Sequence, residues 1–208
     1  MLINEKFKQK LLVEGNDDQH VIWALCEQFH ITESFDVIDC TGIEKVIEQI
    51  PLRFKQSDIE SIGVIIDADT DLKKRFNSLT KVIGNQGFRL PDEFPPDGLV
   101  VMFGRIRFGI WIMPNNDDNG MLEDFISFLI PKEDKLFPIV NSTLDSLEHQ
   151  KINEYQPIHR SKAAIHSWLA WQKDPGTPMG LGITKKYLTT DRETCRKLVN
   201  WLNMLYNP

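Results

Sequence analysis

Short apolar runs alternate with amphipathic stretches in the first part of the chain. The apolar runs have the length of buried strands and lie at residues 11–13, 35–39 and 62–66. Each is followed by apolar positions at helical spacing, at residues 17–30, 43–55 and 72–83. The second of these helices is expected to be interrupted or to end near Pro51. This order predicts an α/β fold with parallel strands joined by crossover helices.

The pattern changes after residue 88. Residues 90–98 hold three prolines and predict a loop, and residues 99–113 predict two β segments around Gly104 and Arg105. A polar loop at 114–120 and a helix at 121–130 follow.

The remaining third of the chain is predicted to be helical. Ser161 is expected to cap a helix that runs to residue 171, and residues 192–206 form the last helix. A segment rich in Gly and Pro at 174–184 predicts a loop between them. We therefore expect an α/β core over residues 1–130 and a helical C-terminal extension over residues 131–208, packed together as one compact unit.

Composition narrows the classes of function. The 208 residues carry 24 Lys and Arg against 30 Asp and Glu, a formal net charge of −6. This balance excludes a histone-like DNA-binding protein, but leaves room for a local basic groove or a metal-mediated phosphate contact. Three separated cysteines without a Cys-x-x-Cys pair favour a reducing compartment. Without an apolar run of signal-peptide or membrane-span length, we expect a cytoplasmic protein with no membrane partner.

Acidic residues follow two predicted strands and begin a later helix. They are Glu14 with Asp18, Asp67 with Asp69 and Asp71, and Glu123 with Asp124. Because parallel strands end at the same edge of a sheet, we expect the Glu14 and Asp67 side chains to meet there. Gathered carboxylates repel one another unless a cation neutralises them, and hard oxygen ligands suit Mg²⁺ or Mn²⁺. The pattern therefore predicts a divalent-metal site.

Each acidic residue also has an ordinary structural interpretation. Asp17 and Asp71 are expected to cap the helices at 17–30 and 72–83, with Asn16 as the other candidate for the first cap. Asp124 suits the N-terminal end of a helix. The acidic residues could also stand by chance in a purely structural α/β domain. Glu-Gly after one strand and Asp-x-Asp after another instead favour a functional site.

At these residues the sequence resembles the Toprim domain, whose pattern is a Glu followed by Gly after the first strand and an Asp-x-Asp after a later one. The longer resemblance is to the OLD (overcoming lysogenization defect) nucleases and to small stand-alone Toprim proteins of uncharacterised function. It rests on LLVEGNDDQHVI, IGVIIDADTD and GMLEDFI. The resemblance implies a Toprim-like Rossmannoid core, a parallel sheet flanked by helices, with a β insertion and a helical C-terminal extension.

The resemblance also implies site residues and an activity. Metal ligands are implied at Glu14, Asp18, Asp67, Asp69 and Glu123, and an assisting lysine is implied at Lys162. The implied activity is a Mg²⁺- or Mn²⁺-dependent nuclease in which Glu14, Asp67 and Lys162 are catalytic. DNA and RNA both stay open as substrates, and so does the oligomeric state.

The sequence departs from OLD nucleases in one respect. Those proteins fuse an ATPase upstream, whereas these residues contain no G-x-x-x-x-G-K-[ST] phosphate loop. We therefore expect a separate ATPase protein as a partner. The alternative is a non-catalytic metal- or nucleotide-binding module that regulates such an ATPase.

Basic and aromatic residues supply further candidates. Lys73 and Lys74 follow the Asp-x-Asp segment, and Arg105 and Arg107 flank the predicted β turn, so these four are candidates for contact with a nucleic-acid backbone. Three tryptophans at helical spacing among apolar residues are expected in the core rather than in base stacking: Trp168, Trp171 and Trp201.

Overall fold

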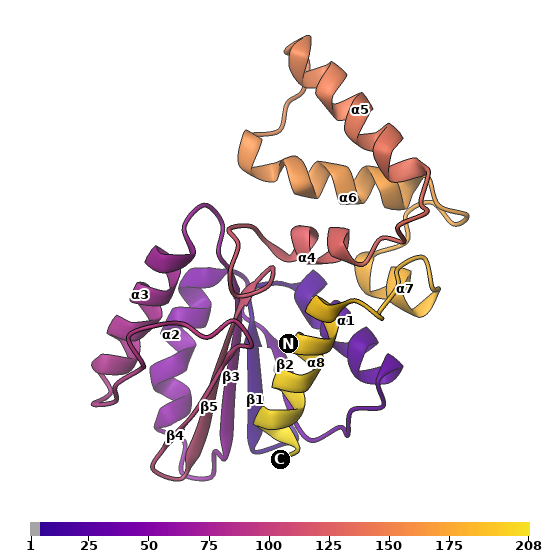
Figure 1. Cartoon of the computed structure of the whole chain (residues 1–208). Coiled ribbons are helices and arrows are strands. Elements are labelled where there is room, and N and C mark those ends of the chain that lie inside the picture. Colours follow the sequence, from indigo (N-terminus) through magenta and orange to yellow (C-terminus); the bar gives the residue numbers. More distant parts are fainter. Residues whose placement is uncertain (1–4) are drawn as a thin grey trace.

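A five-stranded sheet forms the centre of the structure, a computed structural model that describes residues 5–208 (Figure 1). Its strands are β1 (Gln9–Val13), β2 (Asp36–Asp39), β3 (Ser61–Asp67), β4 (Leu99–Phe103) and β5 (Ile106–Met113), in the order β2-β1-β3-β5-β4. All neighbours pair in parallel except β4 and β5. The expected α/β class, a parallel sheet flanked by helices, is confirmed.

The two β segments predicted as an insertion belong to this same sheet. β5 pairs with β3 from Ser61 to Asp67, so it is a central parallel strand, and β4 is the antiparallel edge strand beside it. β5 therefore runs from the amino edge of the sheet to its carboxyl edge.

Helices cover both faces of the sheet. α1 (Asn16–Gln28) and α8 (Glu193–Tyr206) lie on one face, and α2 (Ile43–Phe54) and α3 (Leu72–Gly84) lie on the other (Figure 1). In β3, Ile65 points to the first face, while Val64 and Ile66 point to the second. Because both faces are covered, the strand is apolar at successive positions rather than at alternate ones.

Four of the remaining helices lie beyond the carboxyl edge of the sheet: α4 (Leu122–Phe128), α5 (Leu136–His149), the short 3₁₀ helix η1 (Pro157–His159) and α6 (Arg160–Ala170). The fifth, α7 (Met179–Thr184), lies beside α1. In Figure 1, α4 lies nearest the sheet and the pair α5 and α6 lies farther out. No helix in residues 5–208 is long and apolar enough to cross a membrane.

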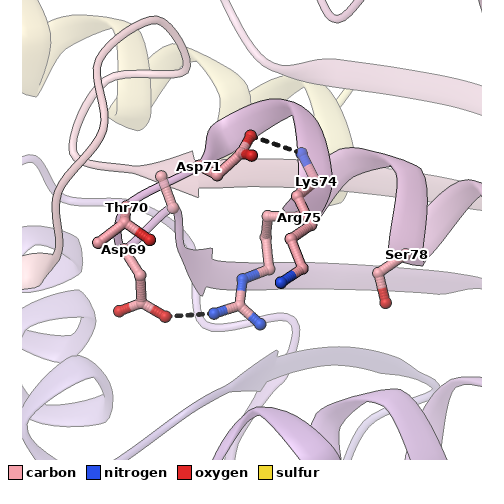
Figure 2. A pocket seen from close by; sticks show the side chains of 7 residues that line it. Asp69, Thr70, Asp71, Lys74, Arg75 and Ser78 are labelled. Atoms are coloured by element: carbon pink, nitrogen blue, oxygen red, sulfur yellow. Dashed lines mark hydrogen bonds and ion pairs between the residues drawn. The ribbon is translucent and has the colours of Figure 1, made fainter.

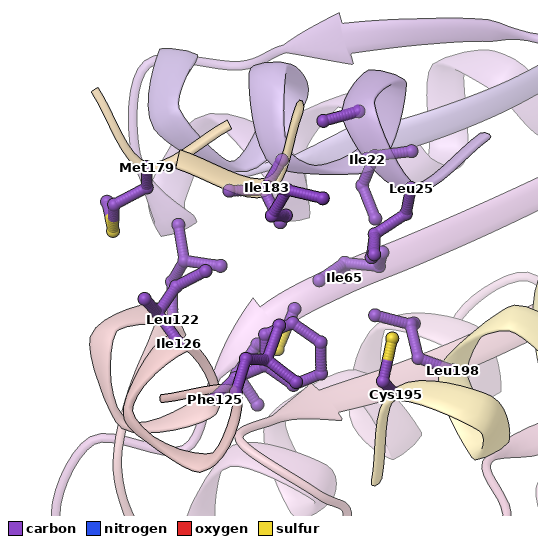
Figure 3. Close-up of a cluster of buried hydrophobic side chains, with 14 of the residues drawn as sticks. Ile22, Leu25, Ile65, Leu122, Phe125, Ile126, Met179, Ile183, Cys195 and Leu198 are labelled. Atoms are coloured by element: carbon purple, nitrogen blue, oxygen red, sulfur yellow. The ribbon is translucent and has the colours of Figure 1, made fainter. Parts of the chain in front are cut away.

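The first face of the sheet is held by side chains from distant parts of the chain. Figure 3 shows Ile22 and Leu25 of α1 near Ile65, with Cys195 and Leu198 of α8 across from them. α8 comes close because β3 and β5 carry glycines where it crosses. A Cβ on Gly109 would lie 2.7 Å from the Leu205 side chain.

The segment at 174–184, predicted as a loop, contains the helix α7. The prediction was wrong because it took glycine as a turn signal. A Cβ on Gly180 would lie 2.5 Å from the His20 carbonyl oxygen, so glycine here allows α7 to pack against the backbone of α1.

Several predicted helix ends also differ from those observed. α2 continues past Pro51, which lies in its last turn. α1 begins at Asn16 after Gly15, and Asp18 rather than Asp17 bonds the backbone N–H of Gly15. The Asp71 cap is confirmed, with its side chain accepting from Lys74 N at 2.9 Å.

Two further expectations concerned Ser161 and the tryptophans. Ser161 lies inside α6 and donates its hydroxyl to Asp124, so it is not a cap. Trp168 and Trp201 are fully buried, as expected. Trp171 is 44% exposed, because it follows the last residue of α6 and lies outside the core.

Candidate functional site

Glu14 and Asp67 meet at the carboxyl edge of the sheet. β1 and β3 are parallel neighbours, and each of these residues stands at the end of its strand. Glu14 Oε1 accepts a hydrogen bond from Asp67 N at 2.8 Å, and Asp67 Oδ1 accepts one from Leu122 N at 3.0 Å. The expected meeting of the two carboxylates is confirmed.

Asp18 adds a buried carboxylate from the first turn of α1. Its side chain is 8% exposed, and Oδ2 accepts a hydrogen bond from Gly15 N at 3.1 Å. Burial, followed by the negative charge of Glu14, raises the pKa of Asp18 to about 7. Close to neutral pH, the Asp18 side chain is therefore present in both its protonated and its ionised form.

Glu123 and Lys162 approach the same edge from α4 and α6. Glu123 is 4% exposed, and Lys162 Nζ lies 3.5 Å from its Oε1. The lysine itself is largely exposed, so its ammonium group is available to an incoming anion. The structure therefore brings Lys162 to the acidic residues although it lies far from them in the sequence.

Asp124 connects the loop before α4 to α6. Its Oδ2 accepts from Met121 N at 2.9 Å, and its Oδ1 accepts from the Ser161 hydroxyl. Gly120 has φ 142°, and a Cβ there would lie 2.6 Å from Asp124 Oδ2. The role expected for Asp124 at a helix N-terminus is confirmed. Its bond with Ser161 also holds α6, the helix that carries Lys162, against α4.

Asp69 stands in the loop after β3 with a left-handed backbone, φ 52°. Its N–H donates to Gly120 O at 2.8 Å, so the loop after β3 is joined to the loop that precedes α4. Its carboxylate forms an ion pair with Arg75 of α3 (Figure 2). Arg75 ends the basic run at residues 73–75 that follows the Asp-x-Asp segment, but the sequence did not predict its pairing with Asp69.

These carboxylates act on one another electrostatically. The pKa of Asp67 is raised well above its ordinary value, by burial first and then by the charges of Asp18, Glu14, Glu123 and Asp69. Burial also raises the pKa of Glu14, while the bond from Asp67 N and the charge of Arg75 oppose that rise. Below we call Glu14, Asp18, Asp67, Asp69 and Glu123 the acidic cluster.

Comparison with known families gives one match. A family described as "Protein of unknown function (DUF3226)" matches residues 8–207, which include every strand and helix from β1 to α8. The chain belongs to the DUF3226 family. No curated protein matches it, and no solved structure does.

The donor atoms of the acidic cluster in this DUF3226 protein suit a hard cation, because all are carboxylate oxygens. As the side chains stand, however, no three His, Cys, Asp or Glu side chains in residues 5–208 are placed as ligands of one ion. The reason is local: Glu14, Asp18 and Asp67 each turn an oxygen toward a backbone N–H. The donor chemistry therefore fits a divalent cation, while the oxygens of these three side chains are engaged with the backbone.

The four basic candidates separate into two pairs in the DUF3226 fold. Lys73 and Lys74 are exposed on the first turn of α3, next to the loop that carries Asp69. Arg105 and Arg107 lie at the amino edge of the sheet, where Arg107 pairs with Ser61 at the start of β3. Six residues of strand, about 20 Å, separate that edge from Asp67.

Both arginines have hydrogen-bond partners at the amino edge of the sheet. Arg105 donates to the Ser57 carbonyl, and Arg107 Nη1 donates to Leu205 O at 2.9 Å. These two arginines therefore lie away from the acidic cluster, because β5 runs parallel to β3 and begins at the opposite edge. Their contact with a nucleic-acid backbone stays a prediction.

Proposed function

We propose that this DUF3226 protein is a Toprim-like, OLD-type nuclease that hydrolyses nucleic-acid phosphodiesters with Mg²⁺ or Mn²⁺. The observation that carries the proposal is the burial of the Asp67 carboxylate among four other carboxylates. Burial and four neighbouring carboxylates raise its pKa, and a fold selected for stability alone has no need of such repulsion. A divalent cation would relieve it, and the resemblance to OLD nucleases supports the same site.

Glu14, Asp18, Asp67, Asp69 and Glu123 would hold the metal. Bound there, one or two divalent cations would activate water for attack and would stabilise the charge that develops on the leaving oxygen. A carboxylate binds metal in its ionised form, and burial together with neighbouring negative charge raises the pKa of both Asp67 and Asp18. Metal affinity should therefore rise with pH.

Lys162 would act on the substrate. Its ammonium lies beside Glu123 and is largely exposed, so it can turn toward a phosphate oxygen and stabilise the charge that grows there during cleavage. Asp124 and Ser161 hold α6 against α4 and so keep Lys162 within reach of the reacting phosphate.

Partners follow from the same proposal. The substrate is DNA or RNA, and a separate ATPase would supply the function that OLD nucleases carry upstream in the same chain. The cytoplasm, where both nucleic acid and ATP are present, is the compartment in which we place this activity.

A second candidate function is a non-catalytic metal- or nucleotide-binding module that regulates a separate ATPase. It is favoured by the ion pairs of two basic side chains with the acidic cluster: Arg75 with Asp69, and Lys162 with Glu123. Basic side chains that are paired in this way leave less positive charge for a nucleic-acid backbone on a chain of net charge −6. Stimulation of the ATPase that persists in Asp67→Ala would support this candidate.

The decisive experiment is calorimetric titration of the protein with Mn²⁺ and Mg²⁺. We expect wild-type protein to bind and Asp67→Asn to lose binding. Asp58→Asn removes one exposed carboxylate at the opposite edge of the sheet and is the matched control. Equal binding by the wild type and Asp67→Asn would refute the metal site. Divalent-dependent cleavage of DNA or RNA that disappears in Asp67→Asn then separates the nuclease from the regulatory module.

A further inference from the structure

A pocket of about 230 Å³ lies on α3 beside the acidic cluster (Figure 2). It is lined by residues 68–71, which follow β3, and by Lys74, Arg75 and Ser78. This volume is smaller than the roughly 300–1,000 Å³ of sites that enclose drug-sized ligands. The pocket therefore suits one small polar group rather than a whole nucleoside.

The pocket presents hydrogen-bond donors from one side of α3. Lys74 and Ser78 are four residues apart and so share a helix face, and Figure 2 shows Lys74 and Arg75 extending to the side where Asp69 lies. Among residues 5–208, the Lys74 ammonium and the Ser78 hydroxyl have no hydrogen-bond or ion-pair partner. These two groups are therefore ready to bind an anion.

The two carboxylates of the pocket already have partners. Asp71 accepts from Lys74 N at 2.9 Å and caps α3, and Asp69 is paired with Arg75. If Asp69 is taken up by a cation in the acidic cluster, the Arg75 guanidinium loses its partner. Its planar fork of N–H donors then faces the pocket, and such a fork matches the geometry of a phosphate group.

We infer that this pocket is an anion subsite for a second phosphate of the nucleic-acid strand, next to the phosphate that is cleaved. Lys74, Arg75 and Ser78 are its donors. The inference rests on the proposed function and deepens it, because it gives an acidic protein a specific place to hold the backbone. It also links the two ligands: metal at Asp69 releases Arg75 for phosphate, so each ligand strengthens the binding of the other.

Lys81, in the last turn of the same helix, provides a matched control. It is exposed on α3 but does not line this pocket. Lys81→Ala and Lys74→Ala therefore remove the same charge from the same helix, and only Lys74→Ala removes a donor from the subsite. Both side chains are exposed, so both variants should fold.

The test is fluorescence anisotropy with short fluorescein-labelled DNA and RNA strands in Ca²⁺, a divalent ion with the same oxygen ligands. We expect Lys74→Ala to bind about tenfold more weakly than the wild type. The slope of log affinity against log salt should fall by about 0.7, the value for one phosphate contact to a single strand. Lys81→Ala should leave both quantities near the wild-type values.

Strands with and without a 5′ phosphate distinguish the source of the group. If Lys74→Ala loses affinity only for phosphorylated strands, the subsite binds a terminal phosphate. If it loses affinity equally for both kinds of strand, the subsite binds an internal phosphate. Equal behaviour of Lys81→Ala and Lys74→Ala overturns the subsite, while binding that still requires Asp67 leaves the proposed function standing. Wild-type protein that binds neither DNA nor RNA overturns both.

Discussion

The Glu14 carboxylate accepts a hydrogen bond from the backbone N–H of Asp67, with 2.8 Å between Oε1 and N. This bond joins the ends of β1 and β3 through a side chain that is also a candidate metal ligand. The structural contribution of Glu14 and its proposed metal binding depend on different properties: an acceptor oxygen and a negative charge. Substitution can therefore separate them.

Glu14→Gln keeps an acceptor oxygen and removes the charge. We expect its free energy of unfolding to equal or exceed that of the wild type, because repulsion within the acidic cluster decreases, and we expect Mn²⁺ binding to be lost. Glu14→Ala leaves the Asp67 N–H without its acceptor and should lower the free energy of unfolding by about 1–3 kcal/mol. Urea titrations in EDTA measure both. Equal destabilisation by the two variants would show that the hydrogen bond does not stabilise the edge.

The pKa of Asp18 predicts how stability depends on pH. Its pKa is about 7 in the folded protein and about 3.9 in an unfolded chain. The folded state therefore holds this proton more tightly, and the stability that results is complete below pH 4 and is lost as pH rises toward 7. The raised pKa of Asp67 acts in the same direction.

In EDTA, the urea midpoint should accordingly fall between about pH 4 and pH 7, and Asp18→Asn should flatten this dependence. Mn²⁺ added at pH 8 should raise the midpoint of the wild type, because it binds the folded state alone. A wild-type midpoint that increases over this pH range would contradict the assignment.

Lys162 is predicted to act on the substrate rather than on the fold. Lys162→Gln removes the ammonium near Glu123 and should lower the rate of divalent-dependent cleavage about 100-fold, with Mn²⁺ affinity unchanged or increased. Lys185→Gln removes a lysine that pairs with Asp174 away from the cluster, and it should retain activity. If Lys162→Gln cleaves at the wild-type rate, the lysine has no part in the reaction.

Two glycines of α7 test the contact with α1. Gly180→Ala should lower the free energy of unfolding by about 2 kcal/mol, because its Cβ meets the rigid His20 carbonyl. In Gly182→Ala the new Cβ would meet the ends of the Leu169 and Leu188 side chains, at 3.3 Å and 3.6 Å, and the cost should be much smaller. Thermal or urea unfolding of the two variants gives the comparison. A larger loss in Gly182→Ala would mean that α7 does not pack as described.

The strands and most helices could be predicted because their signals are local. β3 is apolar at consecutive positions, and Asp71 caps the helix that follows it, so neither inference required knowledge of distant residues. The meeting of Glu14 and Asp67 required only that two strands be parallel neighbours.

What failed depended on long-range contacts. Gly180 lets α7 pack against the His20 carbonyl, and no pattern within residues 174–184 records that neighbour. The position of Arg107, at the edge opposite the acidic cluster, depends on which strand β5 joins, which is a property of the whole sheet. The approach of Lys162 to Glu123 was suggested only by resemblance, since 39 residues separate them. The ion pair of Asp69 with Arg75 was not foreseen at all.

The packing of α8 has a consequence for synthesis on the ribosome. Tyr206 donates its hydroxyl to Lys10 O at 2.9 Å, and Gln9 Nε2 donates to Tyr206 O at 3.2 Å, so β1 is held by a helix that is made almost 200 residues later. At about 5–20 residues per second, synthesis takes roughly 10–40 s to reach α8 from β1. During that time β1 lacks its contacts with α8, and for most of it Lys162 has not been made. The nascent chain therefore completes neither this face of the sheet nor the candidate site until these later residues are present.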